Sequence, residues 1–226
     1  MLKIEAKNTV FKVVSDLLKS TQFKAERNRE QFTHYFEGGF YRLGYGIINY
    51  NPFYKLNFAV SLRIDKFEQI VDLFYPLQEQ QNQSATIIKP ICGNYDSKTK
   101  TYYYGVTSSE GVNQALENFS LNFRSEISGF IKKFSDFCEL EKELNDFTNV
   151  RPNQRKVILG LIVAKAINIQ NFDQLVDNYR KLAERYPIVF QNAETGIYPK
   201  KIRDLLEYLE KWDQQMNVVF PDPWNS

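Results

Sequence analysis

The sequence predicts an α+β protein, with an antiparallel meander sheet of about five strands, an N-terminal helix and a C-terminal helical half. Residues 31–64 alternate apolar and polar side chains across two turn signals, which is typical of antiparallel strands. From Ser109 onward, apolar residues recur every three or four positions, which is the period of amphipathic helices. We therefore expect a single domain, residues 1–226, with a sheet-rich part at 1–107 and a helical part at 108–226.

The composition is that of a globular chain with an aromatic core. Its 226 residues are 43% hydrophobic and 25% charged, which are ordinary proportions for a folded domain. The 18 Phe and 14 Tyr are an excess that predicts a core rich in large rings. The formal net charge is only +2, so the whole chain is not expected to attract nucleic acid or an anionic membrane.

Cysteine usage and hydropathy indicate the cytoplasm. Cys92 and Cys138 form no C-x-x-C pair, and the N-terminus lacks the apolar segment and cleavage site of a signal peptide. The longest apolar run, Val157–Ala164, is interrupted by Gly160 and is much shorter than the roughly 20 residues that cross a bilayer. We expect no transmembrane segment.

Two turns determine the faces of the meander. Gly38-Gly39 suits a tight hairpin turn, and a two-residue turn there sets Phe36 opposite Tyr41. A second loop at 50–53 continues the same alternation, so both turns predict one inner face. That inner face consists of Phe32, His34, Phe36, Tyr41, Leu43, Tyr45, Ile47, Leu56, Phe58, Val60 and Leu62.

The outer face of the meander is the candidate binding surface. Gly44 and Gly46 form a trough of small residues there, which either the chain's own helices or an external partner fills. The outer face consists of Thr33, Tyr35, Arg42, Gly44, Gly46, Lys55, Asn57, Ala59, Ser61 and Arg63. Within it, the partner-binding residues that we predict are Arg42, Gly44, Gly46, Lys55, Asn57 and Arg63.

The remaining elements follow from periodicity and caps. Asp65 and Glu68 have capping-box spacing, in which Glu68 reaches back to the start of its helix. The tail with Pro221 and Pro223 is expected to pack loosely. The other predicted elements are a helix at 4–20, strands at 85–91 and 101–107, one long helix from Ser109 that is continuous or broken near Ser120–Asn122, a buried helix at 156–167, a helix after Asn171 and a final helix from Pro199.

The sequence lacks the residue sets of common catalytic and metal sites. His34 is the chain's one histidine, and its inner-face position predicts a core residue with a satisfied hydrogen bond. One His and two separated Cys leave only carboxylates as metal ligands, and no calcium-loop pattern is present. The glycine pairs match no phosphate-binding motif. We predict no catalytic residue, no metal and no cofactor.

Two further clusters have simpler structural interpretations. Glu139, Glu141 and Glu143 have the appearance of an acid pair for glycoside hydrolysis, but nearby lysines favour a solvated helix face. The run Tyr102–Tyr104 resembles a stacking platform for single-stranded nucleic acid. Strand alternation sends at least one of these rings inward, and no dense basic patch flanks them.

The first 75 residues resemble a known group of proteins. The amphipathic helix, Phe23-Lys24, the aromatic strands with glycines, and the run Leu56–Leu62 are similar to a bacterial domain-of-unknown-function group of α+β proteins. Some members of that group look like immunity or accessory proteins of toxin systems. The resemblance implies an interaction role and no catalytic residues.

Together these observations favour a cytoplasmic protein that binds another protein and has no catalytic activity. Immunity-type and accessory proteins are examples of this class. An alternative is an enzyme or small-molecule binder whose site is assembled from dispersed Tyr, Arg and carboxylate side chains. Binding of single-stranded nucleic acid is a third reading. The sequence specifies neither the partner nor the oligomeric state.

Overall fold

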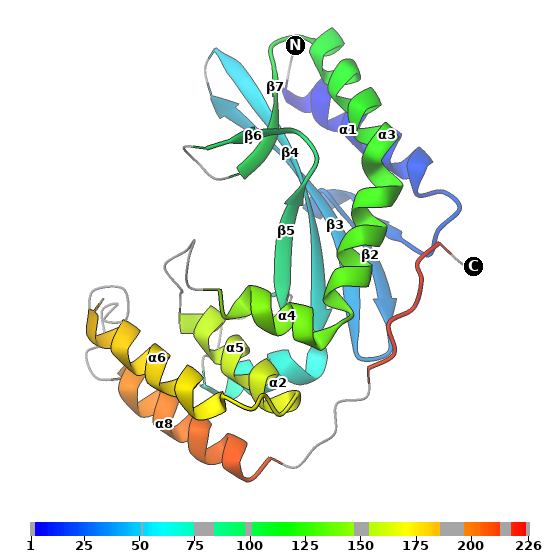
Figure 1. Ribbon diagram of the computed structural model, residues 1–226. Helices are drawn as coiled ribbons and strands as arrows, with labels where there is room; N and C mark the ends of the chain where they lie inside the picture. Colours follow the sequence, from blue (N-terminus) through cyan, green and yellow to red (C-terminus); the bar gives the residue numbers. More distant parts are fainter. Residues whose placement is uncertain are drawn as a thin grey trace. The chain divides into compact units, whose positions relative to one another are not determined.

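The computed structural model describes residues 3–50, 52–74, 84–97, 101–146, 154–185, 197–212 and 218–224, and it confirms the α+β class (Figure 1). The strands are β1 (Lys24–Glu26), β2 (Gln31–Phe36), β3 (Gly39–Tyr50), β4 (Phe53–Ile64), β5 (Ile87–Ile91), β6 (Asn94–Asp96) and β7 (Thr101–Val106). The helices are α1 (Lys3–Leu17), the 3-10 helix η1 (Arg27–Arg29), α2 (Asp65–Phe74), α3 (Ser109–Phe134), α4 (Phe137–Leu144), α5 (Gln154–Ala166), α6 (Phe172–Arg185) and α8 (Ile197–Glu210).

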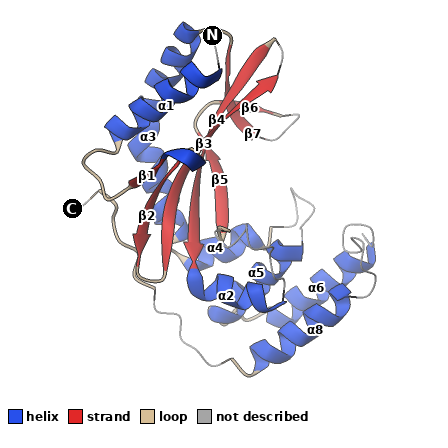
Figure 2. Ribbon diagram, turned by 180° about the vertical axis from the view of Figure 1, so that it is seen from behind, coloured by secondary structure: helices blue, strands red, loops and turns tan. Residues whose placement is uncertain are grey.

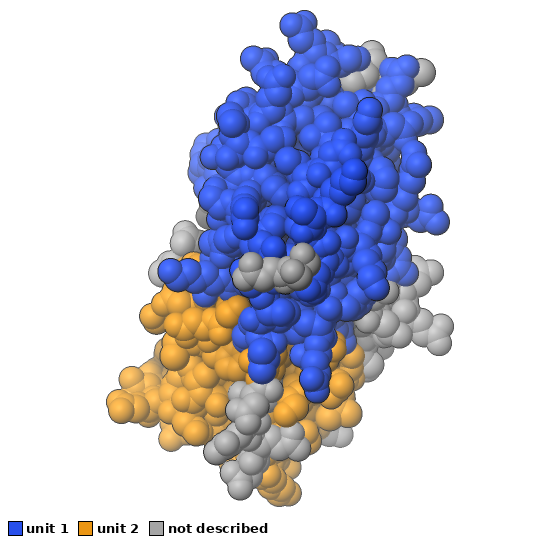
Figure 3. Space-filling model, turned by 90° about the vertical axis from the view of Figure 1, so that its right-hand side faces the viewer, with its two compact units in different colours: residues 1–63, 87–132, 219–226 blue, residues 64–86, 133–218 orange. Residues whose placement is uncertain are grey.

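The chain forms two compact units that interleave along the sequence (Figure 3). Unit 1 comprises residues 1–63, 87–132 and 219–226, and unit 2 comprises residues 64–86 and 133–218. The expected sheet-rich and helical parts met at residues 107 and 108. The structure instead groups most of α3 with the sheet, and it groups α2 with the later helices.

The described strands form one seven-stranded sheet in the order β1-β2-β3-β4-β7-β6, with β5 pairing a second part of β4 (Figure 2). Besides β3, β4 has two further partners because it is long: residues 54–56 pair with β7, and residues 58–62 pair with β5. The two strands beyond the expected five are β1 and β6. Each has three residues, too few to show the alternation that identifies a strand in a sequence.

The β2–β3 register differs from the predicted one by two residues. Phe36 pairs with Gly39, and His34 pairs with Tyr41, so the predicted pairing of Phe36 with Tyr41 is wrong. Of the Gly-Gly pair, only Gly38 lies in the turn with a positive φ of 91°. Gly39 begins β3, where an added Cβ would lie 1.9 Å from the carbonyl oxygen of Arg63. An even shift preserves the faces, because side chains alternate with period two.

The predicted inner face forms the core of unit 1. All of its residues are buried except Phe36, which is half-buried. α1 covers one part of this face, where the rings of Phe11 and Phe32 stack at 5.3 Å. α3 covers another part, where the rings of Phe119 and Phe58 stack at 3.8 Å. Ring stacking between helix and sheet therefore closes this side of the sheet.

His34 is a core residue, as predicted, but its hydrogen bonding differs from the prediction. The side chain is 2% exposed and lies edge-on among the rings of Phe23, Phe36 and Tyr41. Its Nδ1 has no hydrogen-bond partner among the described residues, so the expected satisfied bond is absent there. Burial lowers the pKa of His34 from its ordinary value of 6.5.

We expect the free energy of unfolding to fall in acid because of His34. Its pKa is lower in the folded state than in the unfolded state, so below about pH 6.5 the unfolded chain binds the extra proton. Urea unfolding of wild type and His34→Phe between about pH 5 and pH 8 measures the effect. Relative to the variant, the wild type should lose stability by up to about 1.4 kcal/mol per pH unit. A difference that is independent of pH would contradict this prediction.

In unit 2, α5 is the buried helix that the sequence predicted. Residues 157–164 are all buried, and α5 packs against α2, α4, α6 and α8. Gly160 interrupts the apolar run at the point where polar side chains from α6 and from the end of α4 pack against α5. The Tyr179 hydroxyl donates to Asn145 Oδ1, and Asn145 Nδ2 donates to the Gly160 carbonyl at 3.3 Å. A Cβ on Gly160 would lie 2.1 Å from Asn145 Oδ1.

Gly160→Ala should therefore destabilise the protein by about 1–3 kcal/mol through overpacking, despite the better helix propensity of alanine. Gly129→Ala is the matched control, because Gly129 is an exposed helical glycine whose added Cβ would meet no described atom within 4 Å. The control should be neutral or stabilising by up to about 1 kcal/mol. Chemical denaturation measures both, and the same sign of change in the two variants would refute the steric explanation.

The C-terminal residues differ from the prediction, and α3 adopts the continuous form, one of the two that the sequence left open. Trp224 Nε1 donates to Ser128 Oγ at 2.8 Å, and the rings of Phe220 and Phe36 lie 6.0 Å apart. The prediction of a loosely packed tail is therefore wrong for residues 218–224, because its aromatic side chains bury against unit 1. α3 runs without a break through residues 120–122 and ends at Phe134.

Candidate functional site

The outer face of the sheet, opposite the face that α1 and α3 cover, exposes several large hydrophobic side chains. The exposed fractions are 55% for Tyr35, 48% for Ile48, 49% for Tyr50 and 59% for Ile88. Ile88 belongs to this face because it pairs with outer-face Ser61. Large apolar side chains that gather on one surface are a feature of interaction sites.

Arg42 is fixed at one end of this face by neighbouring side chains. Its guanidinium lies 4.1 Å from the centre of the Phe40 ring, and Tyr35 packs edge-on against the same ring. The Tyr35 hydroxyl donates to Glu26 Oε1 at 3.4 Å. Burial alone raises the pKa of Glu26, but a hydrogen bond from Gln31 and the charge of Arg42 contribute to a net lowering. Both Glu26 and Arg42 in this cluster are therefore charged at neutral pH.

Gly44 and Gly46 do not form one continuous trough. A Cβ on Gly46 would lie 2.7 Å from Asn57 Oδ1, so the side chain of Asn57 occupies that space. Among the described residues, no atom lies within 4 Å of a Cβ built on Gly44. The described glycines with a positive φ are Gly38 and Gly93 alone, so the backbone does not require glycine at position 44. Of these two glycines, Gly44 alone has open space next to it in the part of the chain that the structure describes.

Lys55, another predicted binding residue, is 8% exposed and held by its own chain. Its Nζ lies 4.2 Å from the Tyr50 ring centre and 3.9 Å from that of Tyr103. It also forms an ion pair with Asp96 Oδ2 at 3.5 Å. Arg63, the last predicted binding residue, is half-buried at the end of β4. A partner can thus reach fewer side chains on this face than the six predicted binding residues.

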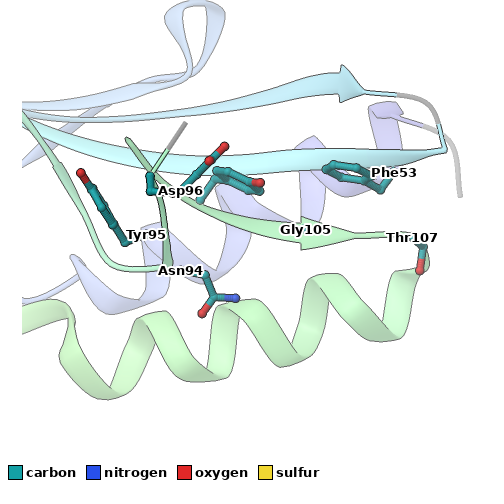
Figure 4. Close-up of a pocket in the computed structure, with 8 residues that line it drawn as sticks. Phe53, Asn94, Tyr95, Asp96, Gly105 and Thr107 are labelled. Carbon is teal, nitrogen blue, oxygen red and sulfur yellow. The ribbon is translucent and has the colours of Figure 1, made fainter. Parts of the chain in front are cut away.

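A hollow of about 690 Å³ lies beside Lys55 on unit 1 (Figure 4). Phe53, Tyr103 and Gly105 contribute its apolar lining, and polar groups come from β6 and from the residues that follow β6 and β7. The lining residues are Phe53, Asn94, Tyr95, Asp96, Ser97, Tyr103, Gly105 and Thr107. Sequence reasoning missed this site, because a three-residue strand, β6, brings the polar residues to it and no motif marks them.

Unit 2 contains a buried charged cluster around Glu68. The carboxylate is fully buried and accepts hydrogen bonds from Thr86 Oγ1 at 2.9 Å, from Ser84 Oγ at 2.9 Å and from Arg155. The capping-box interpretation of Glu68 is therefore wrong, since its side chain points to this cluster. Both carboxylate oxygens have donors, which indicates a structural ion pair.

Arg155→Met should destabilise the protein by about 3–5 kcal/mol, because it leaves the buried carboxylate of Glu68 without its counter-ion. Lys142→Met is the matched control, since Lys142 pairs with Glu139 on an exposed surface, and it should change stability by less than about 1 kcal/mol. Urea unfolding at neutral pH measures both. Equal effects of the two substitutions would contradict a buried structural pair.

Neither His34 nor Cys92, both among the described residues, is activated for nucleophilic chemistry. His34 is enclosed by rings, and burial followed by the charge of Glu126 raises the pKa of Cys92 to about 12, so little thiolate forms at neutral pH. Among the described residues, no three His, Cys, Asp or Glu side chains gather in a way that suits a metal ion. The described helices also include none with the length and apolar character to cross a bilayer.

The three consecutive tyrosines do not form one stacking platform. Tyr103 packs on Lys55, whereas the ring of Tyr104 lies 6.5 Å from that of Phe58 on the inner face. Tyr102 is 39% exposed and lies 5.1 Å from the ring of Tyr95. Strand alternation separates the rings, as the sequence indicated.

Comparison with models of protein families, with curated protein sequences and with solved structures gave no match. The resemblance of the first 75 residues to an α+β group thus stays a prediction.

Proposed function

We propose that this chain is a non-catalytic, cytoplasmic protein-binding protein whose partner docks on the outer face of the sheet around Gly44. The observation that supports this most is the open space above Gly44 on a face that also bears exposed Tyr35, Ile48 and Tyr50. A partner can approach the backbone closely where no side chain stands.

The chemistry of the neighbouring residues suits a protein partner. Tyrosine and arginine are enriched at the energetic centres of protein interfaces, and Tyr35 with Arg42 supplies both at one site. Arg42 is positioned in advance by Phe40, so binding would immobilise little additional side-chain freedom. This arrangement gives a rigid, mostly apolar contact, with the opposite charges of Arg42 and Glu26 at its edge.

More specifically, we propose that the protein has an immunity-type or accessory role in a bacterial toxin system. It is supported by the resemblance of residues 1–75 to the α+β group described above. A protein that blocks a toxin acts by occupying a surface and needs no catalytic group of its own.

Small-molecule binding is a second candidate, and a different observation favours it. The hollow beside Lys55 combines ring faces with several hydrogen-bonding groups, as ligand sites do. It uses other residues than the surface at Gly44.

Gly44→Gln should abolish partner capture while leaving the fold intact, because the new side chain projects into the open space above β3. Gly129→Gln is the matched control, since a Cβ at Gly129 also meets no described atom within 4 Å, and this position lies on α3. Tagged proteins are expressed in the native host, and the recovered partners are quantified by mass spectrometry. Thermal unfolding of each variant confirms that it is folded.

The proposal requires a stoichiometric partner that wild type and Gly129→Gln retain and that Gly44→Gln loses by at least about tenfold, as blocking an interface centre does. Failure to recover any such partner, or equal recovery with Gly44→Gln, would overturn it. A toxin as the recovered protein would support the immunity-type role, and any other partner would exclude it.

A further inference from the structure

The hollow shown in Figure 4 has a long, linear lining. β6 pairs with residues 101–103 of β7, and the lining continues along β7 to Gly105 and, just beyond the strand, to Thr107. At roughly 3.3 Å per residue, the path from the start of β7 to Thr107 is up to about 20 Å long. Asp96 and Thr107 lie toward its opposite ends. This geometry suits an extended chain better than a compact ligand.

One side of β7 has room for a further strand. Residues 104–106 pair with β4 on one side. In the strand order β6 lies on the other side, where it pairs with residues 101–103 only. β6 begins at Asn94 because the chain turns at Gly93, whose φ is 97°. No described strand therefore lies beside residues 104–106 on the side away from β4, and the hollow extends along this edge from Asn94 to Gly105.

This edge of β7 lacks the features that protect other edges of the described sheet. β5 contains Pro90, which cannot donate a backbone hydrogen bond, and β1 contains the charged residues Lys24 and Glu26. Residues 104–107 include neither proline nor a charged side chain. An unprotected edge pairs readily with an added strand, and the main chain at Gly105 is exposed.

Gly105 determines which side chain an added strand would place there. A Cβ on Gly105 would lie 3.8 Å from Phe53 Cδ2, which is an ordinary contact distance, so the fold itself does not require glycine. A residue paired across from Gly105 meets no side chain on β7, and a ring on that residue can cover the glycine and contact Phe53. Aromatic residues next to an edge glycine stabilise strand pairs in this way.

We propose that an extended segment of a protein partner adds to the sheet beside residues 104–107, next to the end of β6. Hydrogen bonds between main chains hold the segment, as in other cases of strand addition. A large apolar or aromatic side chain of the segment covers Gly105. The inference does not rest on docking at Gly44, because the segment binds the edge of a different strand.

Blocked seven-residue peptides, Ac-STVXVTS-NH2 with Phe, Leu, Ala or Asp at X, test the proposal. Each is titrated into the full-length, ¹⁵N-labelled chain and followed by NMR. We expect the Phe peptide to shift the amide signals of Gly105, Val106 and Thr107 with a Kd below about 1 mM. The Ala peptide should bind about threefold more weakly, which is the size of a cross-strand ring contact.

Two N-methylated forms of the Phe peptide distinguish strand pairing from other contacts. The N–H groups of a strand point alternately to its two edges, so methylation of one alternate set removes the bonds to β7 and methylation of the other set leaves them. We expect one form to bind within about threefold of the parent peptide and the other to lose at least about tenfold.

Gly105→Ala tests the position of the ring. Its methyl group fills the space that the ring covers, so it should raise the Kd of the Phe peptide at least about threefold and leave that of the Ala peptide unchanged. Gly44→Ala is the matched control, since a Cβ at Gly44 meets no described atom within 4 Å, and it should change neither Kd.

Four results would overturn the proposal. They are that no peptide shifts these signals, that both N-methylated forms bind alike, that Gly105→Ala leaves the Kd of the Phe peptide unchanged, or that sedimentation shows a dimer that Gly105→Ala dissociates. The last would assign the edge to a second copy of the chain. The outcome is separable from docking at Gly44, because Gly44→Gln should retain peptide binding and Gly105→Ala should retain the captured partner.

Discussion

The burial of the inner face of the sheet under α1 and α3 is the constraint on which unit 1 depends. Stacking of Phe119 on Phe58 and of Phe11 on Phe32 joins the helices to the sheet through large rings. A one-residue slip of any strand would turn these rings to the other face, so the faces are strongly specified. The outer face is free of this demand, which is why open space at Gly44 and exposed rings such as Tyr50 are tolerated there.

The faces of the meander were predictable from the sequence because they depend on alternation alone. The β2–β3 register was not, because it depends on the close approach of Gly39 to the carbonyl of Arg63, which lies on another strand. β6 escaped prediction for a related reason, since backbone pairing with β7 forms it and its three residues have no pattern of their own. Local sequence thus predicts which way a side chain points better than what it meets.

The candidate sites likewise include features that local sequence predicts and features that depend on long-range contacts. Gly44 was identified from the sequence because its face follows from the strand period. The role of Lys55 was not, since its partners Asp96 and Tyr103 come from strands more than forty positions away, and the pairing shows only in the folded chain. Glu68 had a local explanation as a helix cap, but its ion pair with Arg155 spans 87 positions. A long-range partner overrides a weak local preference when the group is fully buried.

The glycines of this chain separate structural demand from possible function. Gly39 and Gly160 are required by contacts, because an added Cβ on either would fall within 2.1 Å of a neighbouring atom. Gly44 and Gly105 have no such requirement, and each stands where other groups gather: exposed rings and Arg42 near the first, polar side chains and two rings around the second. Gly129 is equally unconstrained but lies alone on an exposed helix surface. A glycine that the fold does not require is therefore not by itself evidence of a binding site. It is the surroundings of Gly44 and Gly105 that make these two glycines candidates for binding.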